Sequence, residues 1–320
     1  MTNKMRFIST IYVTSLFILC GCDVNTTNSA QSGIHLQPSS YTELISAFDQ
    51  LNYHWETLEE GVPAFTLDRF PHDMGAIYDV KLKKKLFFLS LLPMVIMQNE
   101  AILEQRNHLK NLLNTTRPLT SEQNRWLANL CRRYQCPGDP VKDGAIRQKL
   151  LQRVDIVPIA LVLAQAANES AYGTSRFAQK ANNIFGQWTF TPGTGLVPSD
   201  RPAGATYEVR KFNTLADSIR SYMNNLNTHP AYQTLREKRA ALRQADAPLE
   251  GKKLAEGLLN YSTRRDAYVD EIQSMIRHNR LAKLASVKLR KEIQLAGAPL
   301  LPHHQLSSRN ASKGVARSSL

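Results

Sequence analysis

The chain has 320 residues and a formal net charge of +13, from 40 basic and 27 acidic side chains. This length is enough for one large domain or two small ones, and the charge suits an anionic polymer or a membrane surface, such as cell-wall glycan or lipid head groups. Nucleic acid is the usual partner of basic proteins, but the export signal described next argues against it. A basic surface that only confers solubility is the alternative.

The N-terminus has the pattern of an export signal. Lys4 and Arg6 precede an apolar stretch, Phe7 to Leu19, that is too short to span a bilayer. The Leu-Cys-Gly-Cys sequence at its end finishes at Cys22 and resembles the lipobox of bacterial lipoproteins. This resemblance implies a signal peptide over residues 1–21, lipid on Cys22 and a lipid-anchored protein of the bacterial cell envelope. An ordinary signal peptide with an incidental cysteine is the alternative.

The residues after the signal indicate a spacer before the folded region. In a Gram-negative host, Asp23 resembles the signal that retains lipoproteins in the inner membrane, where the protein would face the periplasm. Residues 22–40 are polar and offer little to bury, so we expect a flexible tether there.

From Tyr41 onward the pattern is that of helices joined by short turns. The longest apolar run after the signal, Leu86 to Met97, has the length of a buried core helix and not of a membrane span. It lies within a helical pattern over Val80 to Gln105, which we expect Pro93 to interrupt. An N-terminal helical region over residues 41–144 is predicted, with further helices at 39–51 and 120–134.

Turn-forming residues over Cys136 to Gly144 separate this region from a second one at 145–280. The second region is predicted to be helical except for a small β hairpin that includes Thr206 to Phe212. Residues 281–320 hold seven Lys or Arg and one Glu with weak periodicity, so a basic and flexible tail is expected. The predicted class is mainly α with one small β element.

Four cysteines are present, and two of them lie outside the signal. Cys131 and Cys136 form an even pair, so a local disulfide is plausible in an oxidising compartment. A metal site is not expected, since two cysteines at this spacing lack nearby histidine partners.

Glu169 is the first candidate for chemistry. It ends an apolar, alanine-rich helix that begins after Asp155 and Pro158, and Gly173 follows four residues later. Partial burial and the negative end of the helix dipole both favour the neutral form of a carboxyl group and raise its pKa. A carboxyl that holds its proton near neutral pH can act as a general acid. A solvated glutamate at a frayed helix end is the alternative.

Residues 164–186, AQAANESAYGTSRFAQKANNIFG, resemble the glucosaminidase domain of glycoside hydrolase family 73. The resemblance spans about Asp155 to Ile276. The upstream KKKLFFLSLLPMVIMQNEAIL sequence and the His-Pro-Ala-Tyr segment at His229 resemble the Bax-like branch of that family. The resemblance implies a lysozyme-like α+β fold, with a small β-hairpin lobe and an added N-terminal helical region. It also implies cleavage of peptidoglycan strands by a β-N-acetylglucosaminidase, with no cofactor and no metal.

The resemblance also implies site residues. Glu169 aligns with the catalytic acid, and Tyr261, in NYSTRRDAY, matches an active-site tyrosine; a core tyrosine is the alternative. Glu208 is the best match to the family's base on the β lobe, and Arg210 lies on the same side of an alternating strand. A surface ion pair is its alternative reading, and Asp200 is the weaker candidate for the base.

Glu100 is a further candidate acid, because MVIMQNEAIL ends an apolar run with Asn-Glu much as LVLAQAANES does. If the N-terminal helices covered the catalytic region, Glu100 could lie near Glu169, and the two carboxyls would titrate together. A glutamate on a helix surface is the alternative.

Sugar rings bind through apolar faces and hydroxyls, so aromatic side chains next to polar ones are expected in a substrate groove. The segments that carry the resemblance supply both kinds. The candidate substrate-binding residues are Tyr172, Asn183, Phe185, Trp188 and Tyr207.

Three functions are compatible with these residues, two of them enzymatic. The first is a hydrolase that cuts the β-1,4 bond after N-acetylglucosamine, with Glu169 as general acid. A lytic transglycosylase would share the fold and the Glu-Ser sequence but cut after N-acetylmuramic acid. An envelope scaffold that binds glycan without turnover is the alternative from outside the enzymes.

Overall fold

The computed structural model describes residues 34–199 and 201–290, so the signal peptide, Cys22, Asp200 and most of the predicted tail lie outside the described residues. The described fold is mainly helical with two small sheets, which confirms the predicted class. The helices are α1 (Tyr41–Gln50), α2 (Val80–Asn114), α3 (Ser121–Arg133), α4 (Gly144–Arg153), α5 (Ile159–Ser170), α6 (Arg176–Ala181), α7 (Leu215–Thr228), α8 (Gln233–Gln244), α9 (Gly251–Ala255) and α10 (Asp266–His278).

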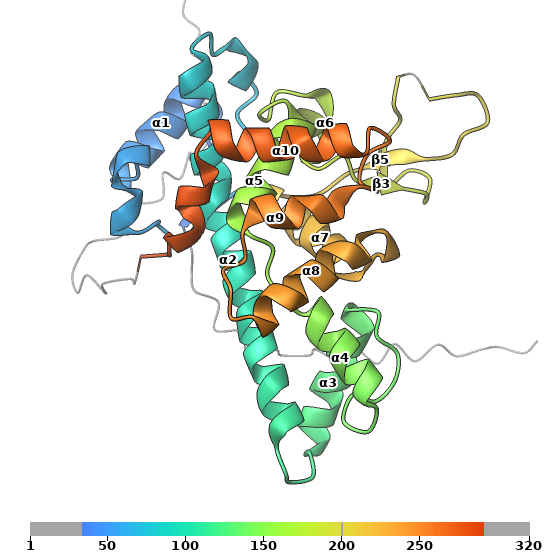
Figure 1. Ribbon diagram of the computed structural model, residues 1–320. Helices are drawn as coiled ribbons and strands as arrows, with labels where there is room; N and C mark the ends of the chain where they lie inside the picture. The colour runs from blue at the N-terminus through green and yellow to red at the C-terminus, as the bar shows by residue number, and fades with distance from the viewer. Residues whose placement is uncertain (1–33, 200, 291–320) are drawn as a thin grey trace, which may run out of the picture.

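The strands are short. A two-stranded parallel sheet pairs β1 (Ile34–Leu36) with β2 (Phe65–Leu67). A three-stranded antiparallel sheet, in the order β3-β5-β4, joins β3 (Trp188–Thr189), β4 (Gly195–Leu196) and β5 (Glu208–Arg210). This second sheet lies to one side of the helices in Figure 1 and forms the β lobe. Its strand β5 falls within the strand-like segment of the sequence.

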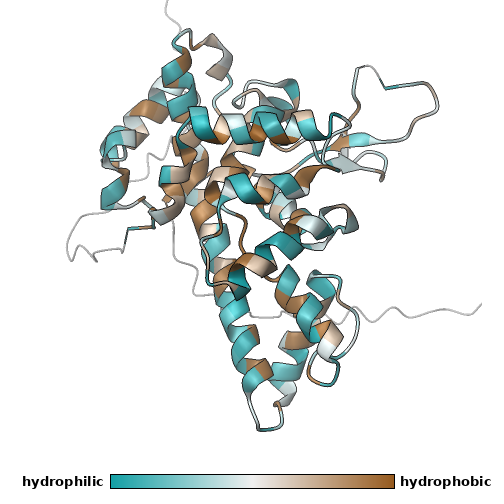
Figure 2. Cartoon of the chain, in the orientation of Figure 1, coloured by the Kyte–Doolittle hydropathy of each residue, from teal (hydrophilic) through white to brown (hydrophobic). Residues whose placement is uncertain are grey.

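Helix α2 runs the length of the molecule, with α5 and α7 packed against it (Figure 1). Its apolar residues from Leu86 to Ile96 are buried, and the hydrophobic colours of Figure 2 concentrate where α2 meets α5. By length and composition α2 could cross a membrane, but 72 % of its apolar window is buried inside the structure. It therefore serves as a core helix, as the apolar run predicted.

The sequence predicted that Pro93 interrupts this helix, but α2 continues through it. A proline within a helix has no backbone N–H, so the carbonyl oxygen of the residue four positions earlier loses its partner. That residue is Leu89, and the Tyr53 hydroxyl donates to its carbonyl oxygen at 3.1 Å. Tyr53 and Pro93 are both buried, so a side chain from outside the helix satisfies the acceptor that proline leaves free.

The lower half of α2 packs with α3 and α4 in a second, smaller core. Its buried members include Leu109, Leu130 and Leu150. Cys131 and Cys136 lie in this core as free thiols, so the predicted disulfide is wrong. Cys131 lies near the end of α3 and Cys136 lies in the turn that follows it. The Cys136 N–H donates to the Cys131 carbonyl oxygen at 2.9 Å and closes this turn. Both side chains act as small buried apolar groups, and burial raises the pKa of each.

The ordered fold begins earlier and ends later than the sequence indicated. The predicted tether includes Ile34–Leu36, which pairs with β2, and the predicted tail includes a 3₁₀ helix at Leu281–Ser286 whose leucines are buried. Farther along, the Arg290 guanidinium donates to the carbonyl oxygens of Leu51, Asn52 and Gly61 at 2.7–3.1 Å. The two ends of the described chain therefore meet.

Two helices begin with a capping box. Thr120 and Gln123 form a capping box at α3, and Thr214 and Asp217 form another at α7. Both satisfy backbone N–H groups that the first turn of a helix leaves free.

A buried ion cluster precedes α5. Asp155 is 2 % exposed and accepts two bonds from the guanidinium of Arg243, at 2.8 and 3.1 Å. Arg106 and Arg239 lie 3.6 and 3.9 Å from its Oδ2. Burial raises the pKa of Asp155, but the three guanidinium groups outweigh it and hold the pKa below its ordinary value. The cluster ties α2 and α8 to the start of α5.

Candidate active site

Glu169 lies in the last turn of α5, and three left-handed residues in succession end that helix. Ala171, Tyr172 and Gly173 have φ values of 48, 55 and 79°. Gly173 N–H donates to the Ser170 hydroxyl at 2.9 Å, and a Cβ at Gly173 would lie 2.9 Å from the ring of Phe70. A side chain larger than hydrogen cannot fit there. The Glu-Ser and Gly of the sequence thus make a sharp turn that holds Glu169 at a fixed place.

A buried chain of hydrogen bonds ends on the Glu169 carboxyl group. The Tyr222 hydroxyl donates to Gln165 Oε1, and Gln165 Nε2 donates to the Tyr268 oxygen at 2.8 Å. Tyr268 O–H then donates to Glu169 Oε1 at 2.9 Å, and Asn168 Nδ2 lies 3.4 Å from the same atom. Because Oε1 accepts these bonds, Oε2 is the oxygen that can carry a proton.

Burial raises the pKa of Glu169 above its ordinary value, although the hydrogen bond from Tyr268 acts in the opposite direction. No cation lies within 4.0 Å of this carboxyl group among residues 34–199 and 201–290. The electrostatics are those of a carboxylic acid that keeps its proton to a higher pH than a solvated glutamate does.

Tyr268 is the functional residue that sequence reasoning missed. It lies on α10, is 1 % exposed, and is the tyrosine whose hydroxyl meets Glu169. The predicted Tyr261 stacks on Tyr268, with ring centroids 5.3 Å apart and planes 7° from parallel. Its hydroxyl donates instead to the Phe185 carbonyl oxygen at 2.8 Å. Both tyrosines stood in the NYSTRRDAYVDE segment, and a family motif favoured the first of them.

A groove opens beside this acid. Its inner section, about 380 Å³, is lined by Phe185, Gly186, Trp188, Tyr232 and Tyr261, among others. Gly186 has a φ of 63°, and a Cβ built on it would lie 3.5 Å from Glu169 Oε2. Gly186, which lines the inner section, therefore lies next to the oxygen that can carry the proton.

The predicted substrate-binding residues divide into two groups. Trp188 is 51 % exposed and contacts the half-buried Tyr207 with ring centroids 4.2 Å apart, so these aromatic faces are available to a sugar ring. Phe185 is buried and stacks on Tyr222 at 3.8 Å. Its ring supports the groove from below, although its backbone lines it.

Asn183 and Tyr172 have structural contacts. Asn183 is buried, and its Nδ2 donates to the carbonyl oxygens of Gln187 and Arg210 at 2.7 and 2.9 Å. Tyr172 packs edge-on against two phenylalanines of α2, and Lys84 lies 5.1 Å above its ring. These two residues hold the loop after α5 and the approach to the β lobe, and their contact with substrate stays a prediction.

Glu208 lies on β5 and holds the β lobe together. Gly193 N–H donates to its Oε1 at 3.0 Å and Gly195 N–H donates to its Oε2 at 2.8 Å. These backbone bonds, that of Gly193 first, hold the pKa of Glu208 below its ordinary value. The carboxylate is ionised, and each of its oxygens already accepts one backbone hydrogen bond. Its assignment as the catalytic base stays a prediction, and the predicted contact with Arg210 is not among its bonds.

Glu100 does not reach Glu169. Its neighbour Asn99 exchanges two hydrogen bonds with the backbone of Val157, before the first turn of α5, at 2.9 and 3.2 Å. Glu169 lies at the opposite end of α5, and the part of α2 next to it is near Phe88, about 18 Å along the helix from Glu100. Glu100 is exposed, so the suggested coupling of the two carboxyls is wrong.

Residues 144–281 match the model of the glucosaminidase family, described as mannosyl-glycoprotein endo-beta-N-acetylglucosaminidase. The chain is also 32 % identical over 197 residues to Protein bax of Escherichia coli (strain K12), and this alignment covers 62 % of the chain and 70 % of that protein. The chain belongs to the Bax-like glucosaminidase-domain family. No solved structure matches it.

Family membership indicates a glycosidase that acts on a glycan. Glu169, Gly186, Glu208, Tyr261 and Tyr268 all lie within the matched segment. The assignment to glycoside hydrolase family 73 stays a prediction. Among the described residues, no group of three or more His, Cys, Asp or Glu is placed to hold a metal ion.

Proposed function

We propose that this protein is a peptidoglycan hydrolase that cleaves the β-1,4 bond after N-acetylglucosamine, with Glu169 as its general acid. The observation that carries the proposal is the buried Glu169 carboxyl group, bonded by Tyr268 and next to Gly186 of the inner section. We assign the proton to Oε2, from which a glycosidic oxygen bound in the groove would accept it. Transfer of that proton lowers the barrier to departure of the leaving sugar.

The second step is assigned to the substrate, because Glu208 has both oxygens bound to backbone N–H groups. As the bond between C1 and the leaving oxygen breaks, the N-acetyl carbonyl oxygen of the same sugar attacks C1 and forms a cyclic intermediate. Water then adds to C1, and the Glu169 carboxylate takes the proton that this water loses. The products are a strand with a new N-acetylglucosamine reducing end and a strand with a free hydroxyl.

One observation also favours the lytic transglycosylase. An enzyme of that type needs a single acid and no second carboxylate, since a hydroxyl of N-acetylmuramic acid attacks C1 in place of water. The occupied oxygens of Glu208 fit that activity equally well.

Mass spectrometry of fragments from purified peptidoglycan separates these activities. The soluble protein from residue 34 onward is expected to release fragments with reducing N-acetylglucosamine ends, and Glu169→Gln is expected to release none. Anhydro-muramic ends would reassign the protein to the transglycosylases. A folded protein that releases no fragments would support the scaffold function instead.

We also propose that the protein is exported and lipid-anchored through Cys22 in the cell envelope. Its support is the Leu-Cys-Gly-Cys sequence after the apolar stretch. Metabolic labelling with a radioactive fatty acid tests this: the native chain should be labelled and Cys22→Ser should not. An unlabelled native chain would contradict the anchor.

A further inference from the structure

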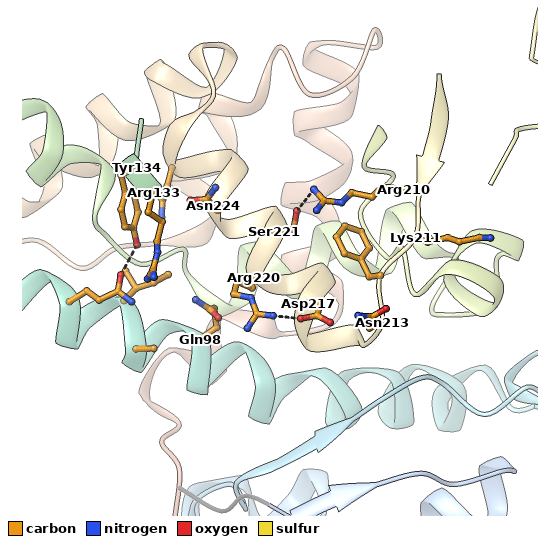
Figure 3. A pocket seen from close by; sticks show the side chains of 15 residues that line it. Gln98, Arg133, Tyr134, Arg210, Lys211, Asn213, Asp217, Arg220, Ser221 and Asn224 are labelled. Atoms are coloured by element: carbon orange, nitrogen blue, oxygen red, sulfur yellow. Dashed lines mark hydrogen bonds and ion pairs between the residues drawn. The ribbon is translucent and has the colours of Figure 1, made fainter. Parts of the chain in front are cut away.

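The groove continues beyond the inner section into a second, larger part of about 820 Å³. The two parts share Arg210, Ser221 and Asn224, so they are continuous. We call the larger part the cationic section. Figure 3 shows it between α2 and α7, with Arg133 and Tyr134 at one end and Arg210 at the other.

The charges that line the cationic section are unbalanced. Four cationic side chains line it, and Asp217 is the single carboxylate among the described lining residues. That carboxylate pairs with Arg220. Lys211 points away from the others in Figure 3. Within residues 34–199 and 201–290, no carboxylate lies within 4.0 Å of the guanidinium groups of Arg133 or Arg210.

The inner section differs in chemistry. Apart from Arg210, its lining residues are uncharged, and aromatic groups such as Trp188 and Tyr261 are among them. Uncharged sugar rings match such a surface through their apolar faces and hydroxyls. The inner section already provides the contacts that a neutral sugar uses. The cationic section adds the guanidinium groups of Arg133 and Arg210, which have no carboxylate partner among the described residues and can bind carboxylates.

Six of the 15 residues that line the cationic section lie outside the family-matched segment. Gln98, Ile102 and Gln105 of α2, with Arg133 and Tyr134 at the end of α3, all precede residue 144. The Tyr134 hydroxyl donates to Gln105 Oε1 at 3.2 Å and so fixes the end of α3 against α2. Arg133, next in sequence to this fixed residue, is exposed toward the groove. The N-terminal helices therefore extend the groove of the catalytic region.

We propose that the cationic section binds carboxylates carried by the glycan strand, so that the N-terminal helices select charged strands over neutral ones. This inference rests on the proposed function for the identity of the strand. Two chemical groups on such a strand supply carboxylates: the lactyl group of N-acetylmuramic acid where no peptide is attached, and the stem peptide where one is. Both would meet Arg133 and Arg210 while the neutral rings occupy the inner section.

Binding, not cleavage, tests this proposal, so its failure is distinct from a failure of the proposed function. In a Glu169→Gln background, Arg133→Gln is compared with Arg125→Gln, which removes the same charge from an exposed position of the same helix but does not line the groove. Co-sedimentation is measured at low salt with intact strands, with strands stripped of peptides, and with intact strands whose carboxylates have been converted to amides.

Arg133→Gln is expected to weaken binding to intact strands about three-fold, the size of one exposed charge interaction. Arg125→Gln, and either variant on amide strands, should differ little from the parent, and Arg133→Lys should restore most of the binding. A loss confined to stripped strands assigns the lactyl carboxylate, a loss confined to intact strands assigns the peptide, and a loss on both shows that the section accepts either carboxylate. The proposal is overturned if Arg133→Gln has no effect on either intact or stripped strands, matches Arg125→Gln, or acts equally on amide strands.

Discussion

The two ends of helix α5 carry carboxyl groups in opposite electrostatic surroundings. Asp155, before the first turn, is enclosed by the guanidinium groups of Arg106, Arg239 and Arg243, and its pKa lies below the ordinary value. Glu169, in the last turn, is held by the neutral hydroxyl of Tyr268, and its pKa lies above the ordinary value. Burial opposes ionisation at both ends, so the partner decides the outcome.

The difference explains why only one of the two groups suits catalysis. A carboxylate paired with guanidinium groups stays ionised and stabilises the fold, but it has no proton to give. A carboxyl next to neutral donors keeps its proton, at a cost in stability whenever it must ionise. Glu208 resembles Asp155 in this respect, although backbone N–H groups take the place of the arginines.

Replacing the acid should have the largest effect. Glu169→Gln keeps the shape and the hydrogen bond with Tyr268 but removes the proton, so kcat should fall by about 10³-fold, within the range for a general acid. Fragment release from purified peptidoglycan measures it. Asn168→Ala, which removes a neighbouring contact of 3.4 Å, is the matched control and should retain most activity. A fall of less than ten-fold for Glu169→Gln would mean that another group supplies the proton.

Stability should change in opposite directions at the two ends. Asp155→Asn leaves buried arginines unpaired and should lower the free energy of unfolding by about 3 kcal/mol. This loss should be present above the ordinary pKa of aspartate and should disappear as the pH falls through the lowered folded pKa, because the wild-type group is then protonated too. Urea unfolding at several pH values measures it, and a loss of the same size at low pH would contradict the ion cluster.

Glu169→Gln should instead raise the free energy of unfolding at neutral pH, by about 1 kcal/mol. The folded pKa of Glu169 is raised, so the wild-type protein loses stability as the pH rises from the ordinary glutamate value to that folded value, and glutamine does not. The advantage should vanish below the ordinary pKa. A neutral-pH destabilisation by Glu169→Gln would show that the ionised group is stabilised, against the desolvated site described here.

Tyr268→Phe should sharpen the contrast further. The hydrogen bond from Tyr268 lowers the pKa of Glu169, so its removal should raise that pKa and move the alkaline limb of the kcat profile to higher pH. Loss of orientation should reduce the maximum rate about ten-fold. Tyr261→Phe is the matched control, since its hydroxyl bonds Phe185 and not Glu169. A limb that moves equally in both variants would contradict a direct role for Tyr268.

Glu208→Gln is expected to have the smallest effect on chemistry. Glutamine has one acceptor oxygen in place of two, so only one of the Gly193 and Gly195 N–H groups keeps its bond, and the charge is lost. The loop between β3 and β4 should therefore open more often. We expect a rise in KM of about three-fold with kcat nearly unchanged, and faster proteolysis within the β lobe. A fall in kcat as large as that for Glu169→Gln would make Glu208 the base and refute the substrate-assisted step.

Local signals in the sequence were sufficient to place several helices and the end of the helix that carries Glu169. The apolar run, the Glu-Ser sequence and Gly173 located the turn that holds Glu169. These features depend on residues within a few positions of one another. Motif resemblance to the family added the expectation of a groove that binds sugar rings.

Contacts between distant residues could not be predicted in this way. Tyr268 reaches Glu169 across 99 positions, and its neighbour in the motif, Tyr261, has an equally suitable side chain. The continuity of α2 through Pro93 depends on Tyr53, 36 positions before the carbonyl it bonds. The occupied oxygens of Glu208 depend on a turn whose geometry no local pattern specified.

Helix α2 has a consequence for how this protein can be dissected. Its upper half buries the apolar face of α5 and its lower half completes the small core with α3 and α4. A fragment cut to residues 144–281 would expose that face of α5 and would also lose Leu284 and Arg290, which close the fold against its beginning. The segment that matches the family model is therefore smaller than the unit that packs around one core.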